Sequence, residues 1–504
     1  MKKSILFLIA ITTVIQLSGQ KDRVYTDLIG ALKSPAEVYI LNVENKGMSS
    51  ISYIERLINL EKLNLAGNRL IILPKELGLL KNLKECDLSG NSGITSLPLE
   101  FYNLNKLKKL NVANNQIAII APEIKNLNQL EELNLAKNNL SNIPFEMGEL
   151  KTLKTLNLAE NRLTALPPNF YNLTGLEILT LNNNQLPGLN SDIGKLTKLK
   201  EFTLHKNRLT SLPNEIGNLA LLTKLTLSGN LLTGVPDGIG KLINIGKIEL
   251  NDNNLASLPS GIGNLTKITE LNLSSNKLTS LPAEIGNLTH LKALDLSNNN
   301  LQKIPESIGN LTKLEVLILA PNKITEIPSS IGNLTNLKKL ILSPNELAAI
   351  PTGIGNLNNL KALDLSGNKI SSVPAGIGNL KNIDSLDLKS NNIKELPKEI
   401  GSLAKLKFLD LSRNNISLLP VEIGSLSSLI SLDLSNNQLT SLPAEIGNLA
   451  SLEELRLNGN QLNFFPDEIG RLQNLKRLYL KGNEISSKEM KKLSGLLPKC
   501  SIKY

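Results

Sequence analysis

Tryptophan is absent from this sequence, and aromatic residues make up only 3% of a chain that is 41% hydrophobic. A core with so few ring side chains must be filled by many copies of aliphatic residues instead. Such a composition is typical of a repeat protein, in which one small unit is stacked many times. It argues against a mixed globular core.

Cysteine and histidine are equally scarce. The two cysteines, Cys86 and Cys500, lie near opposite ends of the chain and cannot supply the disulfide framework of a small oxidised domain. The two histidines, His205 and His290, are far apart, and the sequence contains neither a phosphate-binding loop nor a Cys/His cluster with metal-ligand spacing. We therefore predict no enzymatic activity, no catalytic residues, no cofactor and no metal site.

The charge pattern argues against a nucleic-acid partner. The formal net charge is +10, but Lys and Glu alternate throughout the chain. The Tyr and Phe residues form no series on which bases would stack. We expect a protein partner and no nucleic acid.

The N-terminal segment resembles a secretory signal peptide. Lys2 and Lys3 precede an uncharged apolar run at 5–17, and the small residues Ser18 and Gly19 follow. We expect cleavage after Gly19 and export to the periplasm, the cell surface or the medium. No later apolar run is long enough to span a bilayer, so no transmembrane segment is expected.

One asparagine recurs with a nearly constant period. Of the 18 intervals between successive copies, 17 are 23 residues long and one is 24. The copies are Asn68, Asn91, Asn115, Asn138, Asn161, Asn184, Asn207, Asn230, Asn253, Asn276, Asn299, Asn322, Asn345, Asn368, Asn391, Asn414, Asn437, Asn460 and Asn483.

Apolar residues occupy fixed offsets from this asparagine. Leu291, Leu294 and Leu296 precede Asn299, and the last two alternate with polar residues as in a strand with one buried face. Pro305 and Gly309 follow, and these residue types prevent a long helix. Each unit is therefore predicted to be one short strand, a corner and a short 3₁₀ or irregular return.

The consensus "LxxLxLxxNxLxxLPxxIGNLxx", over roughly residues 38–490, resembles the leucine-rich repeat in its 23-residue Leu-Pro form. The resemblance implies an α/β solenoid, a horseshoe with about 20 short parallel strands on its concave face and short 3₁₀ or irregular segments on its convex face. Helical caps are expected at both ends, because terminal repeats would otherwise expose their leucines. The predicted organisation is a signal peptide at 1–19, an N-terminal cap at 20–37, the solenoid at 38–486 and a C-terminal cap at 487–504.

The recurrent asparagine is expected to be structural. At the corner after each strand the backbone amides lose their sheet partners, and an unpaired buried group costs about 1–3 kcal/mol. An asparagine amide both donates and accepts hydrogen bonds, so it can pair with these groups in its own and the neighbouring repeat.

Binding must then use the strand positions that do not enter the core. An apolar cluster, Val316, Ile318 and Ile341, stands in two adjacent repeats and is predicted to face solvent. Burying such side chains would contribute roughly 1.5–3 kcal/mol each, and they form our first candidate ligand site. Drift of the repeat sequence is the alternative explanation.

An aspartate column is the second candidate, with Asp364, Asp387, Asp410 and Asp433 in four consecutive strands. Mutual repulsion would favour a nearby cation, supplied by Lys389, Arg413, a metal ion or a basic ligand. The alternative is inheritance of a common "LDLS" repeat consensus. Two exposed aromatic residues on the same face complete the candidates for ligand binding: Phe408 and Tyr479.

These observations predict a monomeric, non-enzymatic protein-binding module. The sequence also resembles exported bacterial leucine-rich-repeat proteins, which implies a bacterial source and, by family analogy, a host ligand. Two alternatives stay open: a structural or organising protein of the bacterial envelope, and a cytoplasmic signalling scaffold if the N-terminal segment does not direct export.

Overall fold

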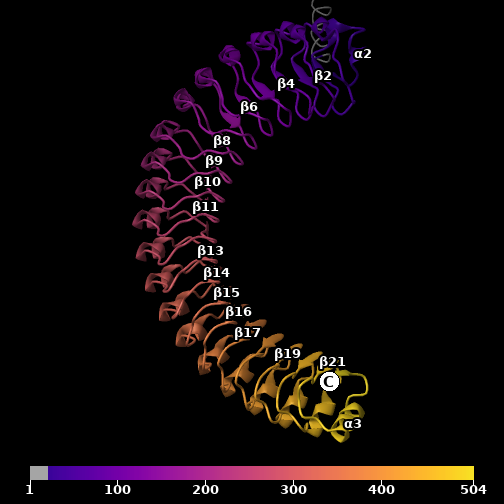
Figure 1. The fold of residues 1–504 in the computed structure, drawn as a ribbon, viewed down its shortest axis with the longest axis vertical. Coiled ribbons are helices and arrows are strands. Elements are labelled where there is room, and N and C mark those ends of the chain that lie inside the picture. Colours follow the sequence, from indigo (N-terminus) through magenta and orange to yellow (C-terminus); the bar gives the residue numbers. More distant parts are fainter. Residues whose placement is uncertain (1–20) are drawn as a thin grey trace, which may run out of the picture. The chain divides into compact units, whose positions relative to one another are not determined.

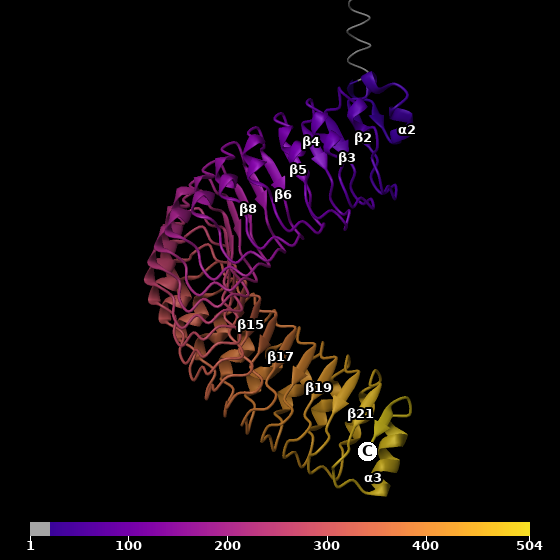
Figure 2. The ribbon, with the colours of Figure 1, turned by 45° about the horizontal axis from the view of Figure 1, so that its top comes forward.

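The computed structural model describes residues 21–504, so the predicted signal peptide lies outside the described residues. The chain separates into two compact units, which divide between Leu232 and Thr233. Each unit is a stack of repeats with a strand on one side and a 3₁₀ helix on the other (Figures 1 and 2). The sequence period alone does not predict this division.

The N-terminal unit contains ten strands and one α-helix among its described residues. The strands are β1 (Val24–Tyr25), β2 (Ile40–Asn42), β3 (Lys62–Asn64), β4 (Glu85–Asp87), β5 (Lys109–Asn111), β6 (Glu132–Asn134), β7 (Thr155–Asn157), β8 (Ile178–Thr180), β9 (Glu201–Thr203) and β10 (Lys224–Thr226), and the helix is α2 (Leu28–Ala31). The 3₁₀ helices are η1 (Pro35–Glu37), η2 (Ile54–Arg56), η3 (Lys75–Leu79), η4 (Leu99–Asn103), η5 (Pro122–Asn126), η6 (Phe145–Glu149), η7 (Pro168–Asn172), η8 (Ser191–Lys195) and η9 (Asn214–Asn218).

The C-terminal unit contains twelve strands and one α-helix. The strands are β11 (Lys247–Glu249), β12 (Glu270–Asn272), β13 (Ala293–Asp295), β14 (Val316–Ile318), β15 (Lys339–Ile341), β16 (Ala362–Asp364), β17 (Ser385–Asp387), β18 (Phe408–Asp410), β19 (Ser431–Asp433), β20 (Glu454–Arg456), β21 (Arg477–Tyr479) and β22 (Ser501–Lys503), and the helix is α3 (Ser487–Leu496). The 3₁₀ helices are η10 (Asp237–Lys241), η11 (Ser260–Asn264), η12 (Ala283–Asn287), η13 (Glu306–Asn310), η14 (Ser329–Asn333), η15 (Thr352–Asn356), η16 (Ala375–Asn379), η17 (Lys398–Ser402), η18 (Val421–Ser425), η19 (Ala444–Asn448) and η20 (Asp467–Arg471).

Neighbouring strands in each unit pair in parallel at the same repeat offset. Leu271 of β12, Leu294 of β13 and Leu317 of β14 lie side by side, and all three are buried. The alternating pattern therefore places one column of leucines in the core and leaves the intervening side chains on the open side of the sheet. This confirms the predicted fold class of short parallel strands with 3₁₀ returns and helices at both ends.

The 3₁₀ helices pack closely on one another, and this explains the glycine that most of them contain. A Cβ atom added to Gly286 would lie 2.3 Å from the carbonyl oxygen of Ser307 in the next repeat. The sequence analysis explained this glycine only as a helix breaker. The structure adds a second reason, because only a residue without a side chain admits such an approach.

The recurrent asparagines form the expected ladder of hydrogen bonds. The amide nitrogen of Asn276 donates to the carbonyl oxygens of Leu273 at 3.0 Å and Leu250 at 2.9 Å, while its oxygen accepts the N–H of Leu255 at 3.0 Å. Asn276 thus links two repeats and pairs buried backbone groups. In the 24-residue repeat, the oxygen of Asn115 has no partner, although its nitrogen keeps its bonds.

The residue before the ladder asparagine usually has a positive φ, as at Ser275 (54°) and Gly367 (60°). Proline cannot adopt that conformation. At Pro321 and Pro344 the preceding peptide bond is cis.

Both ends of the chain carry short α-helices. Asp27 caps α2 by accepting the N–H of Gly30 at 2.7 Å, and Ser486 caps α3 by accepting the N–H of Glu489 at 3.2 Å. Leu493 of α3 is buried, and β22 pairs with β21. No helix within residues 21–504 has the length and apolar character needed to cross a bilayer.

Candidate functional site

The open side of the sheet is built from three positions in each repeat, at six, four and two residues before the ladder asparagine. We call this surface the strand face. It includes the three residues of the apolar cluster and the four of the aspartate column, which the parallel register brings into rows.

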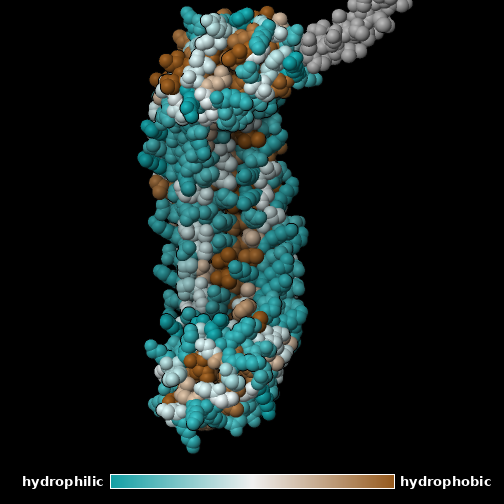
Figure 3. All heavy atoms as spheres, turned by 90° about the vertical axis from the view of Figure 1, so that its right-hand side faces the viewer, coloured by the Kyte–Doolittle hydropathy of each residue, from teal (hydrophilic) through white to brown (hydrophobic). Residues whose placement is uncertain are grey.

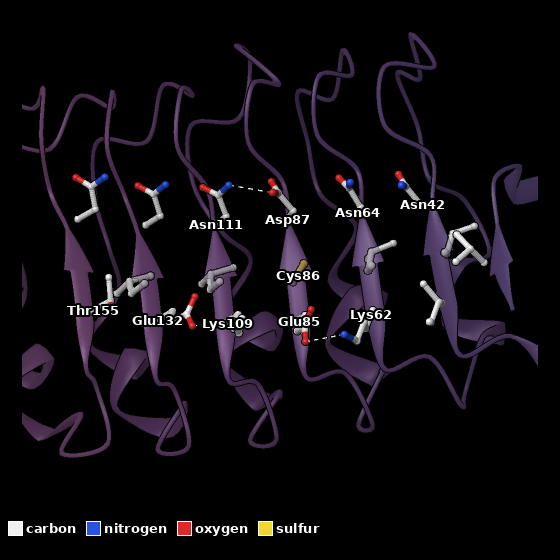
Figure 4. A pocket seen from close by; sticks show the side chains of 18 residues that line it. Asn42, Lys62, Asn64, Glu85, Cys86, Asp87, Lys109, Asn111, Glu132 and Thr155 are labelled. Carbon is white, nitrogen blue, oxygen red and sulfur yellow. Dashed lines mark hydrogen bonds and ion pairs between the residues drawn. The ribbon is translucent and has the colours of Figure 1, made fainter. Parts of the chain in front are cut away.

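In the N-terminal unit the strand face carries polar strand residues from β3 to β7. It forms a hollow of about 590 Å³ over β1–β7, away from the residues predicted from the sequence. Figure 4 shows Asn42, Asn64, Asp87 and Asn111 in one row across neighbouring strands. Asp87 accepts a hydrogen bond from the Asn111 amide at 2.9 Å, so members of this row bind one another.

Charged side chains of this hollow are also paired. Lys62 lies 2.9 Å from Glu85 on the next strand, and Lys109 lies 2.7 Å from Glu132 (Figure 4). Cys86, beneath them, is buried and forms no disulfide, and burial raises the pKa of its thiol. The hollow therefore offers a ligand few unpaired groups.

The apolar cluster lies on β14 and β15. Ile318 is directly opposite Ile341, and Val316 faces Ala293 of β13. A hollow of about 240 Å³ over β11–β14 is partly lined by Val316 and Ile318. Figure 3 shows patches of apolar side chains among polar residues on the side that faces the viewer.

The cluster is less exposed than the sequence analysis expected. All three side chains are half-buried, because neighbouring strands about 4.8 Å apart shield one another's side chains. The gain from burying them against a ligand is correspondingly smaller than for fully exposed residues.

The aspartate column continues in register from the cluster. Ile341 of β15 is paired with Asp364 of β16, and Asp364, Asp387 and Asp410 follow one another across β16–β18. Asp433 on β19 completes the column.

One carboxylate oxygen of each aspartate accepts a backbone N–H just after the end of its own strand. The Oδ1 atom of Asp410 accepts the backbone N–H of Ser412 at 2.9 Å and its hydroxyl at 2.6 Å. Asp364, Asp387 and Asp433 accept the equivalent N–H at 2.9–3.0 Å. The D-x-S spacing of the repeat contained this signal, and the sequence analysis did not use it.

Among residues 21–504 no side-chain cation forms an ion pair with the column, although the charge of Lys389 acts on Asp387 and Arg456 lies opposite Asp433. Neither Lys389 nor Arg413 forms an ion pair with the column, and the described side chains contain no group of His, Cys, Asp or Glu arranged to hold a metal ion. Burial, followed by the neighbouring charges of Asp410 and Asp364, raises the pKa of Asp387 to about 6.

Phe408 lies beside the column. Its side chain is 49% exposed, and it lines a hollow of about 270 Å³ together with Asp387, Asp410, Asp433 and Arg456. An exposed ring among carboxylates suits a ligand that is both apolar and cationic.

Tyr479 has a different environment. Its ring is half-buried, with Arg456 5.1 Å and Lys503 5.2 Å from the ring centre. Arg456 and Arg477 also bind the carboxylate of Glu454, which is 8% exposed. Tyr479 therefore belongs to a packed cluster of charged residues near the C-terminus, and the sequence analysis missed its partners because they come from three strands.

Protein-family profiles match the repeats over most of the chain. The profile described as "leucine-rich repeat region" matches residues 119–207, 189–281, 271–350, 350–409 and 398–499, and that of the single leucine-rich repeat matches 59–80. The chain belongs to the leucine-rich-repeat family. Comparison with curated protein sequences gives no match.

Solved leucine-rich-repeat structures cover nearly all of the chain. A leucine-rich-repeat protein of Leptospira interrogans is 34% identical, with 96% of this chain and 100% of that chain covered and a TM-score of 0.59. A TDR receptor is 31% identical over 95% and 87%, with a TM-score of 0.76. The plant receptor RGFR1, solved in complex with RGF2, is 30% identical over 89% and 84%, with a TM-score of 0.66.

The leucine-rich-repeat assignment explains the core, the ladder and the strand-ending role of the aspartates, since all of these recur along the stack. It does not explain Ile318 and Ile341, which interrupt the aspartates at the same offset on β13 and β16. The cluster therefore departs from the repeat pattern, and the column without ion pairs lies beside it.

Proposed function

We propose that the chain is a non-enzymatic protein-binding module that takes its ligand on the strand face of the C-terminal unit. The observation that carries the proposal is the apolar cluster, because solvent-facing aliphatic side chains in register on adjacent strands have no role in the repeat core. Known leucine-rich-repeat proteins support a binding role, since RGFR1 was solved with a peptide hormone.

Affinity capture with the mature chain tests this function. Extracts of host cells and bacterial envelope fractions are passed over the wild type and over a variant with Val316, Ile318 and Ile341 changed to Asp. A control variant carries Asp at Leu418 and Val421, which are exposed in the same unit but lie off the strand face. A ligand held by the wild type and the control, and lost by the cluster variant, supports the proposal.

Equal capture by all three proteins would contradict it and place recognition elsewhere on the surface. Circular dichroism and unfolding midpoints of the three proteins must agree, so that loss of binding reflects the surface and not the fold. Light scattering of the purified chain tests the accompanying proposal that it is a monomer.

We also propose that the protein is exported from a bacterium. The proposal rests on the charged start, apolar run and small residues of segment 1–19. Sequencing of the N-terminus of the protein recovered from its native cells tests it. A mature chain that starts near Gln20 supports export, whereas an intact Met1 supports a cytoplasmic scaffold.

A further inference from the structure

The C-terminal unit places two unlike surfaces next to each other. The apolar cluster ends at Ile341 on β15, and the aspartate column begins at its strand partner, Asp364 on β16. No strand separates the two. A ligand that lies across the strands therefore meets aliphatic side chains first and carboxylates immediately afterwards.

The column differs from several other charged positions of the strand face, which are paired. Lys62 with Glu85, Lys109 with Glu132, and Lys247 with Glu270 form ion pairs between adjacent strands. In the column, by contrast, four carboxylates follow one another without an ion pair among the described residues. Like charges about 5 Å apart repel one another, and a cationic ligand would relieve this.

We propose that the strand face from β14 to β19 binds an extended segment of a partner protein, with aliphatic side chains on the apolar cluster and Lys or Arg side chains along the aspartate column. This inference rests on the proposed function and names the chemistry of its ligand.

The dimensions fit such a segment. Four strands of the column span about 14 Å, since parallel strands lie about 4.8 Å apart. Side chains on one face of an extended chain recur about every 6.6 Å, so two or three basic residues at alternate positions match the column. The whole strip from β14 to β19 corresponds to about seven or eight extended residues.

Two further side chains of the strand face shape this binding strip, one within the aspartate column and one at its end. Phe408 offers an exposed ring between the carboxylates, against which the aliphatic stem or the cationic head of a Lys or Arg packs. Arg456 on β20 stands opposite Asp433 and places a positive charge at the end of the column. A further basic residue of the ligand is disfavoured there, so the strip ends at β19.

A random dodecapeptide display library, panned against the full mature chain, tests the proposal while the partner protein is still unidentified. Enriched peptides are synthesised, and their dissociation constants are measured by fluorescence anisotropy. We expect enrichment of peptides that combine aliphatic residues with Lys or Arg at alternate positions.

Substitutions then locate the binding. Changing Asp364, Asp387, Asp410 and Asp433 to Asn keeps the Oδ1 acceptor that ends each strand, and is expected to weaken binding by at least about 30-fold in combination and by about 3- to 5-fold for each single change. Asp87→Asn is the matched control. Asp87 makes the same bonds with Ser89 but lies on β4 in the N-terminal unit, outside the strip, so its replacement should leave the dissociation constant unchanged.

The inference would be overturned by enriched peptides that are neutral or acidic, by binding that survives loss of all four carboxylates, or by no enrichment at all. Peptides that lose binding only in the cluster variant would refute the basic ligand while leaving the proposed function intact. A protein ligand captured equally by the wild type and the cluster variant would refute the proposed function itself.

Calcium binding that displaces the basic peptides and is abolished by the Asn changes would reassign the column to a metal ion and also overturn the inference.

Discussion

Ile318 and Ile341 lie directly opposite each other on the parallel strands β14 and β15, on the side of the sheet that does not enter the core. At the same offset the flanking strands carry Asp295 and Asp364. A pair of isoleucines framed by aspartates is unlike the rest of this face, and both the proposed function and the ligand chemistry inferred above start from it.

The asparagine ladder gives a prediction on stability. Replacing Asn276 by Leu removes its three bonds to carbonyl oxygens, at 2.9, 3.0 and 3.2 Å, and leaves the N–H of Leu255 unpaired. We expect the free energy of unfolding to fall by more than about 2 kcal/mol, measured by denaturant titration. Asn287→Leu, an exposed change in the same repeat, serves as the control, and an equal effect of the two changes would refute the ladder's role.

The close packing of the 3₁₀ helices gives a second prediction. Gly286→Ala would place a methyl group 2.3 Å from the Ser307 carbonyl oxygen, so backbone must move. We expect a loss of about 1–3 kcal/mol. Gly234→Ala, where no atom lies within 4 Å of the added methyl, should be nearly neutral. Equal unfolding midpoints for the two variants would show that neighbouring 3₁₀ helices tolerate a wider spacing.

The raised pKa of Asp387 predicts that the free energy of unfolding depends on pH. Burial and the carboxylates of Asp364 and Asp410, opposed by the backbone N–H and the charge of Lys389, raise its pKa from 3.8 to about 6. The folded chain therefore holds this proton more tightly than the unfolded chain. The resulting stabilisation is present below about pH 4 and is lost as the pH rises through about 6.

Asp387→Asn, which resembles the neutral carboxyl group, should therefore be more stable than the wild type at pH 8. We expect a difference of about 1 kcal/mol after allowing for solvent exposure of the side chain, and a smaller one at pH 4. Urea unfolding at both pH values measures it. A larger gain in stability at pH 4 than at pH 8 for Asp387→Asn would contradict the assignment.

Cys86 provides a probe of unfolding in the N-terminal unit. Its side chain is buried, and burial raises the pKa of the thiol, so little thiolate is present or accessible in the folded chain. In a Cys500→Ser variant we expect no reaction with a chromogenic disulfide reagent under native conditions and full reaction in denaturant. Fast native labelling would indicate that this repeat opens on its own.

The sequence predicts the fold well where a residue acts through its offset in the repeat. The leucine columns and the asparagine ladder follow from spacing alone, since every copy meets the same neighbours. The contacts that could not be predicted from the sequence are those set by the distance between neighbouring repeats. The shielding of Val316, the approach of Gly286 to Ser307 and the partners of Tyr479 all involve residues of different repeats that meet only when the repeats stack.

The candidate site was predicted in part for the same reason. The aspartates were placed in one column by their offset, but their strand-ending bonds to residues such as Ser412 were missed. Those bonds make part of the column structural and leave the second oxygen of each carboxylate for a ligand.

Hydrogen–deuterium exchange of the chain with and without its captured protein ligand examines the binding surface most directly. If the ligand lies on the strand face of the C-terminal unit, backbone amides in peptides that contain β14–β19 should exchange more slowly in the complex, while those of η13–η18 on the opposite side keep their rates. Protection confined to η13–η18, or to the N-terminal unit, would contradict the proposed surface.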